Sequence, residues 1–69
     1  MAEVFKTNVQ QNKQAKKLIA VLYSHFPDSK INFDLEDCDK ILRVEGRNVA
    51  PHHVVSLVEK MGFNCAELE

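Results

Sequence analysis

Residues 30–46, KINFDLEDCDKILRVEG, decide the fold of this 69-residue chain. Apolar and polar side chains alternate along its first part, with the period of a strand that has one buried face; the apolar positions are Ile31, Phe33 and Leu35. The acidic run 36–39 is typical of a tight turn. Lys40–Glu45 then predicts a returning strand, with Leu42 and Val44 facing inward. The stretch therefore predicts an antiparallel hairpin near the middle of the chain.

A strand and a helix are predicted before this hairpin. Glu3–Val9 alternates in polarity and carries β-branched and aromatic residues, which predicts a strand. At about 100° per residue, the apolar residues of the next segment form one stripe of a helix; they are Ala15, Leu18, Ile19, Leu22 and Phe26. Pro27 ends this helix, because the residue before a proline disfavours helical backbone.

A second helix and a last strand are predicted after the hairpin. Pro51 suits the first helical position, because its missing N–H would have no partner there. Ala50 before it is a poor N-cap, so the start of this helix is weakly specified. The apolar stripe of this helix consists of Val54, Leu57, Val58 and Met61. Gly62 is the expected stop, and residues 63–68 predict a short strand.

The predicted order of elements, β-α-β-β-α-β, is that of the ferredoxin-like split βαβ unit. We therefore expect an α+β fold, a two-layer sandwich in which a four-stranded antiparallel sheet of order 4-1-3-2 carries both helices on one face. A chain of 69 residues forms a single domain, residues 1–69, and buries only about 60% of its unfolded surface. A core this thin excludes a large enclosed active-site cavity unless a partner supplies a wall.

Charge narrows the classes of partner. Nine basic and ten acidic residues give a net charge of −1, which argues against broad nucleic-acid binding through phosphate contacts. The charge is uneven, because residues 1–30 carry +3 and residues 31–69 carry −4. A bipolar surface of this kind orients a charged protein partner.

The sequence also carries a prediction about compartment. No apolar run approaches the roughly 18 residues of a membrane span. The first residues lack the basic and then apolar pattern of a secretory signal. We therefore expect a cytoplasmic protein with no membrane partner, in which Cys38 and Cys65 are free thiols.

With these elements in place, the chain resembles the heavy-metal-associated (HMA) domain family, which includes small copper chaperones and the N-terminal domains of metal-transporting ATPases. The resemblance spans nearly the whole chain. Its most specific part is EKMGFN at residues 59–64, which is similar to the end of the family's second helix and the loop after it. Leu18 and Leu22 stand where the family's first helix buries Ile or Leu, and Val9 stands where the family usually has a buried Met.

The metal-binding motif of this family is missing. The family holds Cu(I), Zn(II) or related ions through Cys-x-x-Cys, placed between the first strand and the first helix. Aligned through Val9 and Leu18, those two cysteines fall on Gln11 and Gln14. Soft thiolates hold Cu(I), and a glutamine carbonyl is a poor substitute. We therefore expect the usual metal site to be absent, with both glutamines serving the loop or the start of the helix.

Two other sets of residues are alternative metal ligands. Cys38 and Cys65 are expected at the same end of the fold but on opposite edges of the sheet, about 14 Å apart if three strand spacings separate them. That separation is too long for a disulfide or a shared ion. His25 ends the first helix, and His52 and His53 begin the second, so antiparallel helices would bring these ends together. Adjacent His52 and His53 point to different sides of a helix, which weakens a three-histidine cluster.

Catalytic and nucleic-acid-binding motifs are also missing from the sequence. Gly46 and Gly62 stand alone, so there is no glycine-rich phosphate loop, and no serine lies in the context of a nucleophile elbow. The arginine-bearing first loop of acylphosphatases, which share the ferredoxin-like fold, has no counterpart. Residues 40–44 lack the aromatic side chains on which RNA bases stack. The sequence therefore predicts neither an enzyme nor a nucleic-acid-binding protein, and it implies no cofactor.

One surface remains as a candidate site. Lys13, Lys16 and Lys17 share the polar face of the first helix, beside the loop that lacks the cysteines. In chaperones of the HMA family, that helix and loop dock onto a partner domain of the same fold. The resemblance therefore implies a non-catalytic interaction module that binds an acidic protein domain, such as one of the same fold, through these lysines and Phe63. The alternative is an atypical heavy-metal binding or transport protein that uses the cysteines or histidines, and the oligomeric state is left open.

Overall fold

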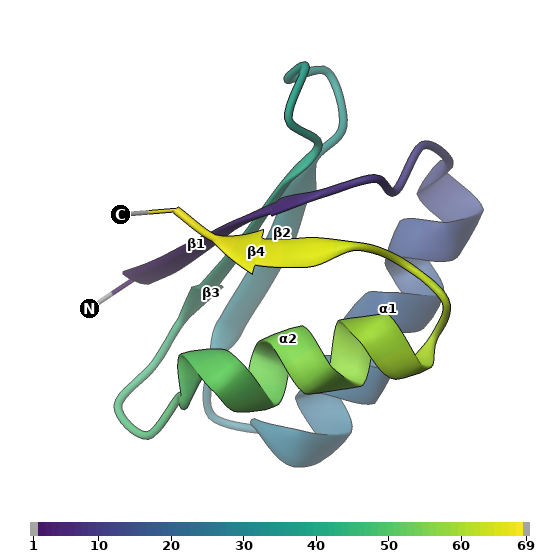
Figure 1. Ribbon diagram of the computed structural model, residues 1–69. Helices are drawn as coiled ribbons and strands as arrows, with labels where there is room; N and C mark the ends of the chain where they lie inside the picture. Colours follow the sequence, from purple (N-terminus) through teal and green to yellow (C-terminus); the bar gives the residue numbers. More distant parts are fainter. Residues whose placement is uncertain (1, 69) are drawn as a thin grey trace.

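The computed structural model describes residues 2–68 and contains six elements in the order β-α-β-β-α-β (Figure 1). The strands and helices are β1 (Ala2–Thr7), α1 (Asn12–His25), β2 (Lys30–Asp34), β3 (Ile41–Glu45), α2 (Pro51–Lys60) and β4 (Cys65–Glu67). Neither helix is long and apolar enough to cross a membrane within this described part of the chain. The predicted order of elements is confirmed.

The four strands form one antiparallel sheet of order β2-β3-β1-β4. The predicted order 4-1-3-2 is this same order read from the other edge. The hairpin of residues 30–46 is present, and it pairs Ile31 with Val44 and Phe33 with Leu42. This connectivity is compatible with the predicted ferredoxin-like arrangement.

Both helices lie on the same side of the sheet, which gives two layers with the core between them (Figure 1). The side chains of residues paired across neighbouring strands point to the same face of the sheet. Leu42 of β3 pairs with Phe5 of β1 on one side and with Phe33 of β2 on the other, so all three side chains face the helices. The predicted helix stripes supply the other half of the core; their buried members are Ala15, Leu18, Leu22, Val54, Leu57 and Val58. The apolar period of the sequence therefore identifies most of the core.

One predicted strand end and one predicted core residue differ from the structure. The first strand stops at Thr7 and not at Val9, because the Val9 N–H donates to the Thr7 hydroxyl and not to a neighbouring strand. Val9 is still fully buried. Met61, predicted in the buried stripe of α2, is 40% exposed, because the helix ends at Lys60 and the chain then turns at Gly62 with a φ of +94°.

The last strand is shorter than predicted. It covers Cys65–Glu67, whereas the sequence predicts strand over residues 63–68. Phe63 is still tied to the helix before it, since its N–H donates to the Val58 carbonyl at 3.4 Å. The Asn64 N–H is held by the Asn8 side chain at 2.8 Å. Both residues therefore belong to the loop that joins α2 to β4.

Candidate functional site

The antiparallel sheet gathers the loops at two opposite ends of the molecule. One end is formed by residues 8–11, by the β2–β3 turn at residues 35–40 and by the loop at residues 61–64. We call it the glutamine end. The histidine end is formed by the loops at residues 26–29 and 46–50. Helix α1 begins at the glutamine end and finishes at the histidine end, while α2 runs the other way (Figure 1). The predicted site residues lie at or next to these two ends, except that Lys16 and Lys17 lie farther along the first half of α1.

Thr7 holds the glutamine end together. Its N–H donates to the Asp39 carbonyl at 3.0 Å, and its hydroxyl donates to the Lys40 carbonyl. The same hydroxyl accepts the Val9 N–H, and Thr7 pairs with Cys65 in β4. One buried threonine therefore links the first loop, the β2–β3 turn and the last strand.

Helix α1 begins with Gln11 and Gln14, the two positions that the predicted resemblance aligns with the cysteines of HMA domains. The backbone N–H of Gln11 donates to Oε1 of Gln14 at 3.3 Å, as in a capping box, and the Gln11 carbonyl accepts the N–H of Ala15 at 3.0 Å. Neither side chain carries a thiolate for a soft metal ion. The residues present here therefore do not fit the Cu(I) or Zn(II) site that the resemblance implies.

Lys13, Lys16 and Lys17 are all exposed on α1. We call this surface the lysine face. Lys13 is the second residue of the helix, and the first turn contains no acidic residue. A helix N-terminus carries a partial positive charge, so a cation in the first turn opposes the helix dipole. Phe63, the other predicted contact residue, is half-buried and packs against the core.

The β2–β3 turn places acidic groups at this same end. The Asp34 and Asp37 carboxylates accept the N–H groups of Glu36 and Asp39, at 3.2 Å and 2.8 Å. Lys40 closes the turn with a φ of +47°, and its ammonium donates to the Leu35 carbonyl at 2.9 Å. These bonds explain why an acidic run forms an ordered turn.

The turn also contains the one group of three metal-ligating side chains found in the described residues. Possible ligand atoms of Asp37, Cys38 and Asp39 lie within 4.8 Å of one another. Asp37 and Cys38 are exposed, and the Asp37 carboxylate already accepts a hydrogen bond that shapes the turn. The closeness of these three side chains is therefore explained by the formation of the turn, without a metal ion.

The two cysteines are free and differ in their surroundings. Cys38 is exposed in the β2–β3 turn, while Cys65 is buried at the start of β4. The strand order places β2 and β4 on opposite edges of the sheet, as predicted. Burial, with a smaller effect from the Glu59 charge, raises the pKa of the Cys65 thiol to about 11. Cys65 is therefore a protonated thiol at neutral pH, and neither a ready metal ligand nor a nucleophile.

The histidine end brings together residues that are far apart in the sequence. The ring centroids of His25 and His53 lie 5.2 Å apart, with an angle of 80° between the ring planes. His53 also meets the Phe26 ring, at 5.2 Å and 71°. His52 is exposed, and no ring contact places it with this pair. The predicted meeting of the two helix ends is confirmed for His25 and His53.

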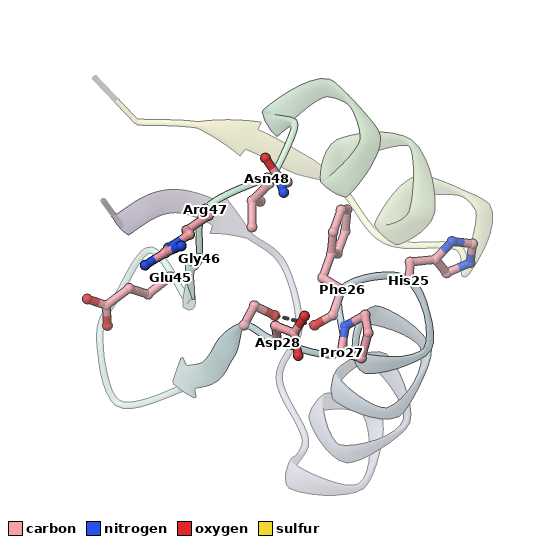
Figure 2. Close-up of a pocket in the computed structure, with 10 residues that line it drawn as sticks. His25, Phe26, Pro27, Asp28, Glu45, Gly46, Arg47 and Asn48 are labelled. Atoms are coloured by element: carbon pink, nitrogen blue, oxygen red, sulfur yellow. Dashed lines mark hydrogen bonds between the residues drawn. The ribbon is translucent and has the colours of Figure 1, made fainter.

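An open depression of about 700 Å³, which the sequence did not predict, is lined in part by His25 and Phe26. Figure 2 shows Phe26 and Pro27 on one side and the segment from Glu45 to Asn48 on the other. Gly46 allows the two loops to approach, because a Cβ there would lie 3.1 Å from Ser29 Cβ and from Val49 Cγ2. An isolated glycine between a strand and a helix was the only sequence signal for this close approach.

Comparison with known proteins does not assign the chain to a family. Neither a family model, nor a curated protein, nor a solved structure matches the chain. The fold and the two ends therefore carry the functional argument.

Proposed function

We propose that this protein is a non-catalytic interaction module, similar to HMA domains but without their metal site, and that its lysine face binds an acidic protein domain. A domain of this same fold is the first candidate partner, by analogy with the docking of HMA chaperones. Phe63 lies in the loop at the same end and supplies apolar contact area. The binding involves no cofactor and no covalent step.

The observation that carries this proposal is the position of Lys13. A lysine in the first helical turn, without an acidic neighbour in that turn, opposes the helix dipole and costs stability. Residues that lower stability are expected where function needs them. Lys16 and Lys17 extend the same positive charge along the exposed surface of α1.

A second observation supports a docking role over a metal-carrying one. Gln11 and Gln14 form the helix start at the positions where HMA domains have thiolates, and Cys65 is buried with a raised pKa. The start of α1 is held by its own hydrogen bond and needs no bound ion. The neighbouring lysines are therefore free to contact a protein. An acidic partner would be steered to them from solution by long-range attraction.

Charge reversal tests the proposal. The variant Lys13→Glu/Lys16→Glu/Lys17→Glu changes three charges on the lysine face. Its matched control is Lys30→Glu/Arg47→Glu/Lys60→Glu, which changes three exposed charges elsewhere and gives the same net charge. Partners are first captured by cross-linking in the source cells, and association rates are then measured with the purified partner over a range of salt concentrations.

We expect an acidic partner whose association with the wild-type protein slows as salt rises. The lysine-face variant should associate at least about tenfold more slowly at low salt, because steering contributes 10-fold or more to such rates. The control should keep most of the rate. An equal loss in both variants, or an association rate that salt does not change, would contradict the proposal.

A second candidate function is atypical heavy-metal binding or transport. The observation in its favour is the pairing of His25 with His53, since imidazole is a common ligand of divalent transition metals. The metal content of the purified protein separates the two functions. Stoichiometric metal that raises the melting temperature favours the second, and substoichiometric metal without such a shift favours the interaction module.

A further inference from the structure

The pairing of His25 and His53 follows from the way the two helices end and begin. Helix α1 stops at His25 because Pro27 follows two residues later, and the helix C-cap Phe26 donates its N–H to the Leu22 carbonyl at 2.8 Å. Helix α2 begins at Pro51, so His53 lies in its first turn. The antiparallel packing of the helices then sets one imidazole against the other.

The two rings differ in exposure: the half-buried His53 ring is fixed in place, and the exposed His25 ring is free to rotate. His53 is half-buried and packs against Phe26, so its position is held by the core. His25 is exposed at the rim of the depression, and Figure 2 shows its ring pointing away from Asp28 and Arg47. Rotation about the Cβ–Cγ bond of His25 turns its nitrogens while its ring centroid stays almost in place. The distance between centroids is therefore the quantity to compare with a metal site.

That distance is the one expected for two imidazoles on a tetrahedral ion, and it is also an ordinary separation for rings in edge-to-face contact, as between Phe26 and His53. A zinc–nitrogen bond of about 2.1 Å places the ion about 3.2 Å from the centre of each imidazole ring. Two such rings at the tetrahedral angle of about 109° have centroids about 5.2 Å apart, whereas a square-planar angle of about 90° gives about 4.5 Å. The His25 and His53 centroids lie 5.2 Å apart, and their planes are nearly perpendicular.

We propose that His25 and His53 form a binding site for Zn(II) that bridges the C-terminus of α1 and the N-terminus of α2. Two imidazole nitrogens bind the ion, and water occupies the remaining positions, because His52 does not join the pair and the described residues offer no third ligand in a cluster here. The negative end of the α1 dipole favours a cation beside His25, whereas the positive end of the α2 dipole beside His53 opposes one, so the proposed site rests on the two imidazoles and not on the helix dipoles. With two protein ligands the site is open, so the bound ion remains accessible to a ligand supplied by another molecule.

This site is separate from the lysine face, which lies at the other end of α1. It gives the second candidate function a defined pair of ligands and an ion. Loss of zinc binding would leave the proposed protein docking untouched, and loss of docking in the lysine-face variant would leave zinc binding untouched. The two proposals therefore fail independently.

Titration with Zn(II) alone tests the site, with the imidazole proton signals followed by NMR and the affinity measured by calorimetry. We expect the signals of His25 and His53 to shift together at one ion per chain. His25→Gln should weaken binding by at least about tenfold, since even the loss of a partner outside the metal's own ligand shell costs 10–100-fold. His25 is exposed, so this variant keeps the fold, which the far-UV spectrum and melting temperature without zinc confirm.

Three further variants make the test specific. His53→Gln should weaken zinc binding as His25→Gln does, while its neighbour His52→Gln is the matched control and should bind like the wild type. Cys38→Ser should also bind like the wild type, which separates the site from the thiol in the β2–β3 turn. The proposal is overturned if His52→Gln or Cys38→Ser loses as much affinity as His25→Gln, or if zinc leaves the His25 and His53 signals unshifted.

Discussion

The two ends of the molecule are built from the same sheet but held together in different ways. At the glutamine end, hydrogen bonds cross between segments, from Thr7 to the β2–β3 turn and from Asn64 to Asn8. At the histidine end, the loops meet by close packing at Gly46 and by contacts between the rings of His25, Phe26 and His53. The glutamine end therefore carries charged side chains on loops held by hydrogen bonds, and the histidine end carries imidazoles on loops held by close packing. One topology thus supports two separate surfaces.

The largest effect on stability is expected from removing a buried hydroxyl at the glutamine end, that of Thr7, and we compare it with the loss of the buried Ser29 hydroxyl at the histidine end. Thr7→Val keeps the shape of the side chain but leaves the buried Val9 N–H without its acceptor and the Lys40 carbonyl without its donor. We expect it to lower the free energy of unfolding by about 2–4 kcal/mol, because each group loses a partner. Urea denaturation of the variant and the wild type measures the difference.

Ser29→Ala is the counterpart at the histidine end. The Ser29 hydroxyl donates to the Phe26 carbonyl at 2.6 Å, but that carbonyl also accepts the Ser29 N–H at 3.1 Å and so keeps a partner. We expect a cost of only about 1 kcal/mol. A larger cost for Ser29→Ala than for Thr7→Val would show that hydrogen bonds do not distinguish the two ends as described.

The second prediction concerns pH and the buried thiol of the glutamine end. The pKa of Cys65 is raised to about 11 in the folded protein, above the ordinary value of 9.0 for a cysteine thiol. The folded state therefore favours the protonated thiol, and this contribution is complete below about pH 9 and is lost as the pH rises towards 11. We expect a loss of roughly 2–3 kcal/mol over that range, relative to a variant without the thiol.

Unfolding free energies of the wild type and Cys65→Val, measured from pH 8 to 11, check this prediction. The difference between the two proteins should change across that range, because only the wild type has the thiol to ionise. Cys38→Ser should follow the wild type, since Cys38 is exposed. A constant difference between the wild type and Cys65→Val would show that the Cys65 thiolate costs the fold nothing.

The smallest expected effect tests the charge at the start of α1. Lys13→Glu replaces a cation in the first helical turn by an anion, which the helix dipole favours. We expect the free energy of unfolding to rise by about 0.3–1 kcal/mol, with the effect reduced by added salt. Lys17→Glu, which lies beyond the first turn, is the control and should change stability less. A destabilised Lys13→Glu protein would remove the argument that Lys13 is kept at a cost to stability.

Much of the fold could be predicted from the sequence because its signals are local. The alternation in residues 30–46, the proline at position 27 and Pro51 at the start of α2 each act within a few residues. The errors lie where a distant or side-chain interaction replaces the regular pattern. Val9 leaves the strand because its N–H bonds to the Thr7 hydroxyl, and Met61 leaves the stripe because α2 ends before it.

The candidate sites were less accessible to sequence reasoning. The position of Gln11 and Gln14 beside the lysines is local, and the sequence predicted that these glutamines serve the loop or the helix start. The approach of His25 to His53 followed from the antiparallel helices, but its distance and angle did not. The depression beside them depends on how two loops pack around Gly46, for which an isolated glycine is a weak signal.

The sequence by itself determined the order of elements, most of the core stripes and the absence of thiolates from the first loop. These properties depend on the type and spacing of neighbouring residues, which the chain carries wherever it folds. Only the tertiary structure decided that Thr7 links three segments, that Cys65 is buried with a raised pKa, and that the ring centroids of His25 and His53 lie 5.2 Å apart. Those properties arise from contacts between distant segments, and their geometry is set by packing of the whole sheet and both helices.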